Sequence, residues 1–189
     1  DVYKRQVVQW DPAYDSGSGV YGYAISWDQS PTTLPNTYRD LDGLSYTNLA
    51  TVDSNSYYFH LRTLDVAGNA APNAIHSGPY RIDTTPPTAS FLTPSGAVNS
   101  DYFNVSWTGS DILSDIDSYD VQSSSDYSNW TNWKMDVTFT NANFIGERGV
   151  DYYFRVRARD QAGNLSDWAN SGVVHVGVVE IYIPVIFRE

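Results

Sequence analysis

The sequence predicts an all-β protein made of two tandem antiparallel β-sandwiches, and three observations lead to this prediction. Aromatic residues make up 15% of the 189 residues, with 15 Tyr and 6 Trp, and such side chains suit half-buried strands. Short runs of alternating residues are separated by Gly, Asn, Asp and Pro, which is typical of short antiparallel strands. Finally, two blocks of sequence recur in the same order. Long apolar segments with a period of 3.6 residues are missing, so few helices are expected.

The internal repeat indicates two copies of one domain. Residues 57–69 read YYFHLRTLDVAGN, and residues 152–164 read YYFRVRARDQAGN. A second block lies upstream of each, in which Trp10, Asp15, Ser18, Val20, Tyr23 and Ile25 correspond to Trp107, Asp111, Ser114, Ile116, Tyr119 and Val121. Recurrence of two blocks at a near-constant offset is the signature of a tandem repeat.

A proline-containing stretch separates the two copies. Residues 83–88 read DTTPPT, and two prolines fix φ and remove two backbone donors, which is typical of a stiff spacer. We therefore expect a first module over 7–84 and a second over 85–177. The apolar stretch 178–189 is too short to cross a bilayer, and it is interpreted as a final strand, the first strand of a further module, or an anchoring tail.

The expected strands are short and follow the alternation. In the second module they lie near 88–92, 102–108, 117–124, 129–135, 137–142, 150–159 and 172–177. The first module begins on Val7-Val8-Gln9-Trp10, which corresponds to the second of these strands. We therefore expect the first module to lack its first (A) strand and to be the less stable of the two.

These patterns resemble a known family. The segments 105–107 (VSW), 119–121 (YDV) and the alternation over 152–158 resemble the B, C and F strands of fibronectin type III modules, across nearly all of 7–177. The Asp-x-Ala-Gly-Asn turn and the 83–87 linker resemble tandem immunoglobulin-like repeats of bacterial surface proteins. The resemblance implies a sandwich in a secreted or cell-surface protein, and it says little about function because this fold hosts unrelated activities.

Several repeated residues are expected to be structural. Tyr57 and Tyr152 match the tyrosine-corner position, and Trp10 and Trp107 are expected between the sheets. The turns after the long strands are expected to cap themselves through a carboxylate and two residues that tolerate positive φ. Their residues are Asp65, Gly68 and Asn69 in the first module and Asp160, Gly163 and Asn164 in the second.

An acidic loop follows Trp107 and admits two interpretations. Asp111, Asp115 and Asp117 lie within seven residues, and calcium prefers several carboxylate oxygens. The spacing lacks the full EF-hand pattern, and capping of the loop by its own aspartates is the alternative. Calcium is the only cofactor that the sequence suggests.

The outward face of the 150–159 strand is the candidate binding surface. Period-two alternation places Arg155 and Arg157 opposite the core, beside the strand that carries Trp130 and Trp133. An interleaved ladder of Arg and Trp either covers the sheet or forms a platform for a sugar ring or a partner protein. The candidate residues are Trp130, Trp133, Tyr153, Arg155, Arg157 and Trp168, with Trp27 as a further one.

Charge and missing motifs narrow the function. The net charge of −11 argues against nucleic-acid binding, and the absence of Cys excludes a disulfide scaffold and a cysteine–zinc site. The sequence has no Gly-x-Ser-x-Gly elbow, and its three histidines, His60, His76 and His175, lack metal-ligand spacing. We therefore expect a non-catalytic protein.

The leading hypothesis is a spacer or interaction module of a larger extracellular or cell-surface bacterial protein, with other domains of the same polypeptide as partners. The alternative is a carbohydrate-binding accessory module of a secreted hydrolase. Residues 1–6 (DVYKRQ) resemble the translation of a sequencing adapter, which predicts a metagenomic fragment, and they are left out of the expected fold.

Overall fold

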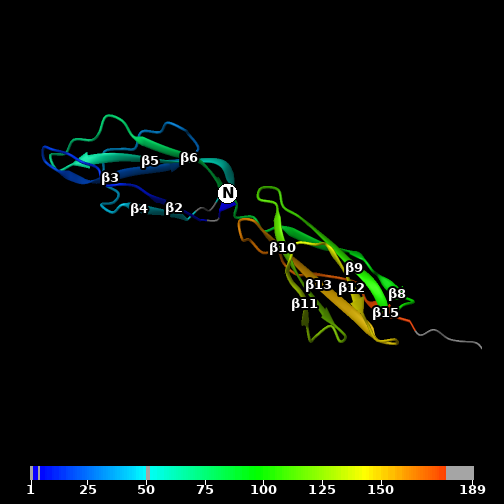
Figure 1. Ribbon diagram of the computed structural model, residues 1–189. Coiled ribbons are helices and arrows are strands. Elements are labelled where there is room, and N and C mark those ends of the chain that lie inside the picture. Colours follow the sequence, from blue (N-terminus) through cyan, green and yellow to red (C-terminus); the bar gives the residue numbers. More distant parts are fainter. Residues whose placement is uncertain (1, 4, 50–51, 178–189) are drawn as a thin grey trace, which may run out of the picture. The chain divides into compact units, whose positions relative to one another are not determined.

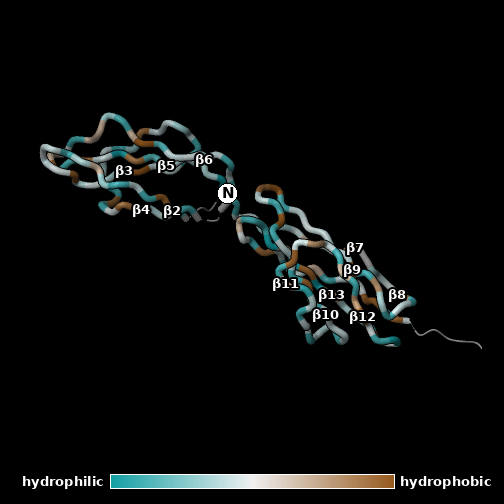
Figure 2. The backbone as a smooth tube through the Cα atoms, in the orientation of Figure 1, coloured by the Kyte–Doolittle hydropathy of each residue, from teal (hydrophilic) through white to brown (hydrophobic). Residues whose placement is uncertain are grey.

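The computed structural model describes residues 2–3, 5–49 and 52–177 (Figure 1). Within these ranges the chain forms strands and no helix, which confirms the predicted all-β class. The chain divides into two compact units: the first holds the residues up to Thr85 together with Gln161–Asn164, and the second begins at Pro86 and holds the rest. We call them module 1 and module 2. Figure 2 shows apolar and polar residues interspersed along the strands, as half-buried sheets require. The apolar stretch 178–189 lies outside the described residues.

Module 1 is a two-sheet sandwich. Its strands are β1 (Val2–Tyr3), β2 (Arg5–Gln9), β3 (Val20–Asp28), β4 (Ser45–Leu49), β5 (Ser54–Asp65) and β6 (Ile75–Ile82). One sheet has the order β1-β6-β5-β3, and the other is the pair β2-β4. All pairings are antiparallel except β1 with β6. Tyr23, Phe59 and Leu61 are buried between the sheets, with Trp10 and Trp27 packed against them.

The N-terminal edge of module 1 differs in part from the expectation. Among the described strands, β2 pairs only with β4, so this sheet lacks a third strand. Residues 2–3 pair with Arg81 and Ile82, and Arg5 and Gln6 pair with Leu49 and Asn48. Leaving residues 1–6 out of the fold was therefore wrong for these positions. Strand pairing uses backbone N–H and C=O groups, so a segment beside an open edge can join a sheet whatever its side chains.

Module 2 contains the remaining strands: β7 (Thr88–Thr93), β8 (Gly96–Val98), β9 (Tyr102–Ser110), β10 (Ile116–Ser124), β11 (Thr131–Val137), β12 (Asn141–Ile145), β13 (Asp151–Asp160), β14 (Ala169–Asn170) and β15 (Val174–Val176). One sheet has the order β12-β9-β7, and the other has the order β11-β10-β13-β15-β8, with β14 also paired to β13. The two short strands β8 and β14 are not among the predicted ones. A sheet of the first, second and fifth main strands facing one of the third, fourth, sixth and seventh is the fibronectin type III arrangement.

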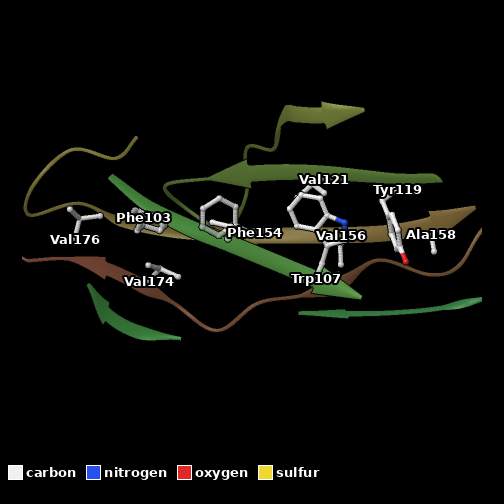
Figure 3. Packing of buried hydrophobic residues seen from close by; sticks show 10 residues of the cluster. Phe103, Trp107, Tyr119, Val121, Phe154, Val156, Ala158, Val174 and Val176 are labelled. Carbon is white, nitrogen blue, oxygen red and sulfur yellow. The ribbon is translucent and has the colours of Figure 1, made fainter. Parts of the chain in front are cut away.

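The core of module 2 follows the alternation of β13. Phe154, Val156 and Ala158 are fully buried in one cluster with Val105 and Trp107 of β9. Figure 3 shows Trp107 among the buried side chains of β13. The alternate residues of β13 point away from this core. Burying each large side chain contributes on the order of 1.5–3 kcal/mol, so this one strand anchors much of the module. Its outward side chains are therefore held on a rigid support.

Candidate functional site on the outer face of module 2

Arg155 and Arg157 of β13 interleave with two tryptophans on the outer face of module 2. The Arg155 guanidinium carbon lies 4.5 Å from the centroid of the Trp130 ring and 4.6 Å from that of Trp168. The Arg157 guanidinium carbon lies 4.7 Å from the Trp168 centroid. Each distance is within the range of a cation–π contact. We call Trp130, Arg155, Trp168 and Arg157 the ladder.

The neighbouring strand β10 fixes the polar edges of the two arginines. Arg155 Nε donates to Gln122 Oε1 at 2.6 Å, and Gln122 Nε2 donates to Asn132 Oδ1 at 2.6 Å. Arg157 donates to Asp120 Oδ2 from Nε at 2.9 Å and from Nη2 at 2.8 Å. This works because Asp120 and Gln122 lie opposite Arg157 and Arg155 in the strand register. Burial, and secondarily the Arg157 charge, lowers the pKa of Arg155.

A tight turn positions Trp130. The Asp126 carboxylate accepts hydrogen bonds from Ser128 N at 2.8 Å, Asn129 N at 2.7 Å, Asn129 Nδ2 at 2.6 Å and Ser124 Oγ at 2.9 Å. These bonds, led by those from Asn129, hold the Asp126 pKa well below its ordinary value. Tyr127 has a φ of 61° in this turn, and its ring packs edge-on against Trp130. This turn was not among the features predicted from the sequence.

Two serines position Trp168 against β13. Ala158 N donates to Ser166 Oγ at 2.9 Å, and Phe154 N donates to Ser171 Oγ at 2.9 Å. The short strand β14, between these serines, pairs with Arg155 and Val156. Hydroxyls thus take the place of strand carbonyls on either side of β14, and they hold the 166–171 segment beside the ladder. The feature of the sequence that could have predicted this position of Trp168 is the serine on each side of it.

Trp133 and Trp27 do not reach this surface, which corrects their placement as platform residues. Trp133 turns into the core, with its ring centroid 5.3 Å from that of Phe144 and 5.6 Å from that of Phe154. Because side chains alternate along a strand, residues three apart such as Trp130 and Trp133 face opposite sides. Trp27 lies in the core of module 1, where it stacks on Tyr80.

Tyr153 does reach the outer surface, beside the ladder. Its ring lies edge-on to Tyr127, with 5.1 Å between centroids. Tyr127 is 51% exposed, and together with Trp130 these rings form an aromatic group at the Trp130 end of the ladder. Of the predicted binding residues, the structure brings together those of the ladder and Tyr153. Tyr127 joins them although it was not predicted.

Of the three aspartates in the acidic loop, Asp111 caps its own backbone. Asp111 Oδ1 accepts hydrogen bonds from Leu113 N at 2.8 Å and Ser114 N at 2.7 Å. Asp117 Oδ2 accepts from Ser118 Oγ at 3.4 Å, and Asp115 occupies a left-handed conformation with a φ of 62°. In the part of the chain that the structure describes, Asp111, Asp115 and Asp117 are not gathered into one group close enough to share an ion. The geometry supports capping as the role of Asp111.

Among the repeated turn and corner residues, Asp65, Asn69 and Tyr152 make local contacts. Asn69 donates to Asp65 from N at 2.6 Å and from Nδ2 at 2.8 Å, which closes the turn after β5. Gly68 and Gly163 adopt φ values of 90° and 83°, which Gly tolerates without strain. Glu147 N donates to the Tyr152 hydroxyl at 3.0 Å, which is the tyrosine-corner contact.

Module 1 has a surface groove, and the carboxylates that line it accept hydrogen bonds within their own turns. Asp15 and Asp65 line this groove together with Tyr14 and Thr63. Asp15 Oδ2 accepts from Gly19 N at 2.8 Å, as Asp65 accepts from Asn69. Paired carboxylates that act on a substrate must point into a cleft, and these two point back into their own loops.

The described residues include no helix long and apolar enough to span a membrane.

Comparison with known proteins gives two curated relatives. The chain is 31% identical over 169 residues to chitinase A1 of Niallia circulans, covering 86% of the chain and 22% of the relative. It is 29% identical over 168 residues to exoglucanase B of Cellulomonas fimi, covering 84% of the chain and 14% of the relative. The chain thus spans about a fifth and a seventh of their lengths. No family model matches the chain.

Solved structures with tandem fibronectin type III domains are also similar. A two-domain fibronectin type III segment of chicken tenascin matches with 18% identity and a TM-score of 0.38, covering 92% of the chain and 93% of that structure. The FN1–FN3 domains of chicken CNTN1 match with 14% identity and a TM-score of 0.36, covering 91% and 63%. Because both TM-scores are below 0.5, the fold assignment rests on the strand order.

The strand order and the residues that hold it define the class of the protein. The chain is a tandem pair of fibronectin type III-like β-sandwiches.

Proposed function

We propose that the two modules act as a non-catalytic spacer within a larger, extracellular bacterial protein. The ladder carries this proposal. Trp168 contacts both Arg155 and Arg157, and Trp130 contacts Arg155, so guanidinium groups cover the ring faces that a sugar would stack on. A surface whose rings are already stacked serves to stiffen the sheet.

The parent protein is proposed to be a secreted polysaccharide hydrolase. The support is that both curated relatives, a chitinase and an exoglucanase, are much longer than this chain. The partners of the modules are then the other domains of the same polypeptide. A net charge of −11 fits this role, because it keeps a surface-exposed spacer soluble.

A second candidate function is carbohydrate binding, and the aromatic group at the Trp130 end of the ladder favours it. Tyr127 is half exposed and lies beside Trp130 and Tyr153. Exposed aromatic rings can stack on the apolar face of a sugar. This group is small, and one face of Trp130 is taken by Arg155.

Depletion by insoluble polysaccharide separates the two candidates. The full chain is mixed with chitin or with cellulose, and the protein left in solution is measured. The spacer proposal predicts no more depletion than for an unrelated acidic protein. Depletion that Tyr127→Ala abolishes, while Arg148→Lys leaves it unchanged, would overturn the spacer role in favour of sugar binding. Circular dichroism of both variants checks that the fold is retained.

A further inference from the structure

We propose that module 1 carries a binding site for a divalent transition-metal ion, with His60 and His76 as its ligands. His60 of β5 and His76 of β6 lie directly opposite each other in the strand register. Their Nδ1 atoms are 2.7 Å apart, and the ring planes meet at 72°. Fifteen residues separate the two histidines in the sequence, so only the sheet brings them together.

The distance between the two nitrogens is close to that of neighbouring ligands on one ion. Imidazole nitrogens bind such ions at about 2.0–2.1 Å. Two ligands at right angles are then about 2.9 Å apart, and two tetrahedral ligands about 3.3 Å apart. To admit the ion, the two nitrogens must separate by a few tenths of an ångström, and the His76 ring must turn so that both Nδ1 lone pairs point at the ion. The exposed His76 ring can make this movement, because it is not packed in the core.

Asp28 positions His60 for this role. Asp28 Oδ1 lies 3.3 Å from His60 Nε2, and a carboxylate there accepts a hydrogen bond from Nε2–H. Neutral His60 then keeps its proton on Nε2 and presents the Nδ1 lone pair to the ion. A carboxylate behind a histidine ligand is the common arrangement in metal sites, where it fixes the tautomer and raises the basicity of the ligand.

The carboxylate itself is held in place. Its Oδ1 atom accepts a hydrogen bond from Ser30 N at 2.8 Å. The His60 ring is completely buried, and Tyr58 packs nearly parallel to it. One ligand of the site is thus rigid, and the other is open to solvent.

Without metal, the neutral pair is joined by a hydrogen bond from His76 Nδ1–H to His60 Nδ1. Metal binding replaces this proton, and His76 takes up a proton on its Nε2 from water in its place, so neutral imidazoles release no net proton. Water fills the remaining coordination positions.

The donor set selects the metal. Imidazole suits Cu²⁺, Ni²⁺ and Zn²⁺, with Cu²⁺ bound most tightly, whereas Ca²⁺ and Mg²⁺ prefer oxygen ligands.

The nearby Arg62 is turned to backbone carbonyls, donating to Ala71 O at 2.6 Å and Pro35 O at 3.0 Å. Module 2 has Arg155 at the position that corresponds to His60, so the site belongs to module 1 alone.

Titration of the metal-stripped full chain with CuCl₂ tests the proposal, using calorimetry for affinity and electron paramagnetic resonance for the number of bound nitrogens. We expect one Cu²⁺ per chain with coupling to two imidazole nitrogens, weaker binding of Ni²⁺ and Zn²⁺, and none of Ca²⁺. His76→Gln, a change at an exposed position, should weaken Cu²⁺ binding at least tenfold and remove one nitrogen. Asp28→Asn should weaken it about tenfold with both nitrogens retained.

His175→Gln is the matched control. His175 lies in module 2 and contacts Asp151 at 2.6 Å, so it reproduces a histidine–carboxylate pair without a second histidine ligand. It should leave Cu²⁺ binding unchanged. The proposal is overturned if the wild-type chain does not bind Cu²⁺, or if His76→Gln binds Cu²⁺ as tightly as the wild type. Loss of binding in His175→Gln would also overturn it.

Discussion

At the scale of single residues, the carboxylates of these modules act mainly on their own loops. Asp65, Asp111 and Asp126 each accept hydrogen bonds from backbone N–H groups two to four residues further along the chain. A short side chain with two acceptor oxygens satisfies donors that a turn would otherwise leave unpaired. An acidic sequence can therefore be rich in Asp and still present few free carboxylates to a ligand.

Asp126 should make module 2 sensitive to acid. Its pKa is lowered in the folded chain, so it stabilises the fold above the ordinary Asp pKa of about 3.9, and this contribution is lost as the pH falls towards the lowered value. Asp126→Asn should lower the urea midpoint clearly at pH 7 and much less at pH 2. Asp167→Asn, at an exposed position, is the control. An equal effect of Asp126→Asn at both pH values would contradict the prediction.

The Tyr152 hydroxyl should matter for stability independently of its ring. Tyr152→Phe keeps the aromatic packing but removes the acceptor of the Glu147 N–H hydrogen bond. We expect the free energy of unfolding of module 2 to fall by about 1 kcal/mol, measured by denaturing the chain in urea and following the unfolding of this module. Tyr102→Phe removes an exposed hydroxyl that contacts a side chain, Asn143, and should cost less. Equal costs would argue against the corner contact.

At the scale of elements, β13 organises both the core and the ladder. Its buried residues pack against β9, and its outward arginines contact tryptophans from two separate loops. Neither loop is part of a long strand. The ladder therefore links the 124–130 turn and the 166–171 segment to the sheet. This explains how one strand fixes the conformation of two irregular segments.

Arg155→Lys should loosen the ladder although it keeps the charge. An ammonium cannot stack between two rings or present the planar fork that meets Gln122. The expected loss of unfolding free energy is about 1–2 kcal/mol, with a change in the tryptophan fluorescence of the native state. Arg148→Lys, at a surface ion pair with Asp101, should change stability by less than about 0.5 kcal/mol. If both variants are equally stable, the ladder does not stabilise the sheet.

At the scale of the whole molecule, the two modules have the same two-sheet arrangement, but they differ in the number of strands in each sheet. Module 2 has a three-stranded sheet β12-β9-β7, whereas the matching sheet of module 1 is the pair β2-β4 among the described residues. Fewer strands bury less apolar surface and leave more backbone groups without strand partners. The stability of the chain should therefore be uneven.

Hydrogen exchange should show this difference. Amides of β2 and β4 are expected to exchange faster than those of β9 and β12 under native conditions, because local opening of a two-stranded sheet breaks fewer contacts. Mass spectrometry of peptides from the full chain measures both sheets in one sample. Equal protection of the two sheets would contradict the prediction.

The sequence by itself determined the fold class and the duplication. The repeat of residues 57–69 at 152–164, and the alternation along both copies, record which side chains face the core, because side-chain direction alternates strictly along a strand. The same rule predicted Arg155 and Arg157 on the outer face. Trp133 was nevertheless predicted on that face, although the same alternation puts it on the opposite side from Trp130, three positions away.

Only the tertiary structure decided which distant side chains meet. The pairing of His60 with His76 depends on the register of β5 and β6, and the stacking of Trp168 between arginines depends on how a loop returns to β13. The pairing of residues 2–3 and 5–6 depends on strand edges left open elsewhere in the chain. Local patterns specify the direction of each side chain, whereas contacts between strands far apart in sequence depend on registers and loop paths that no local pattern encodes.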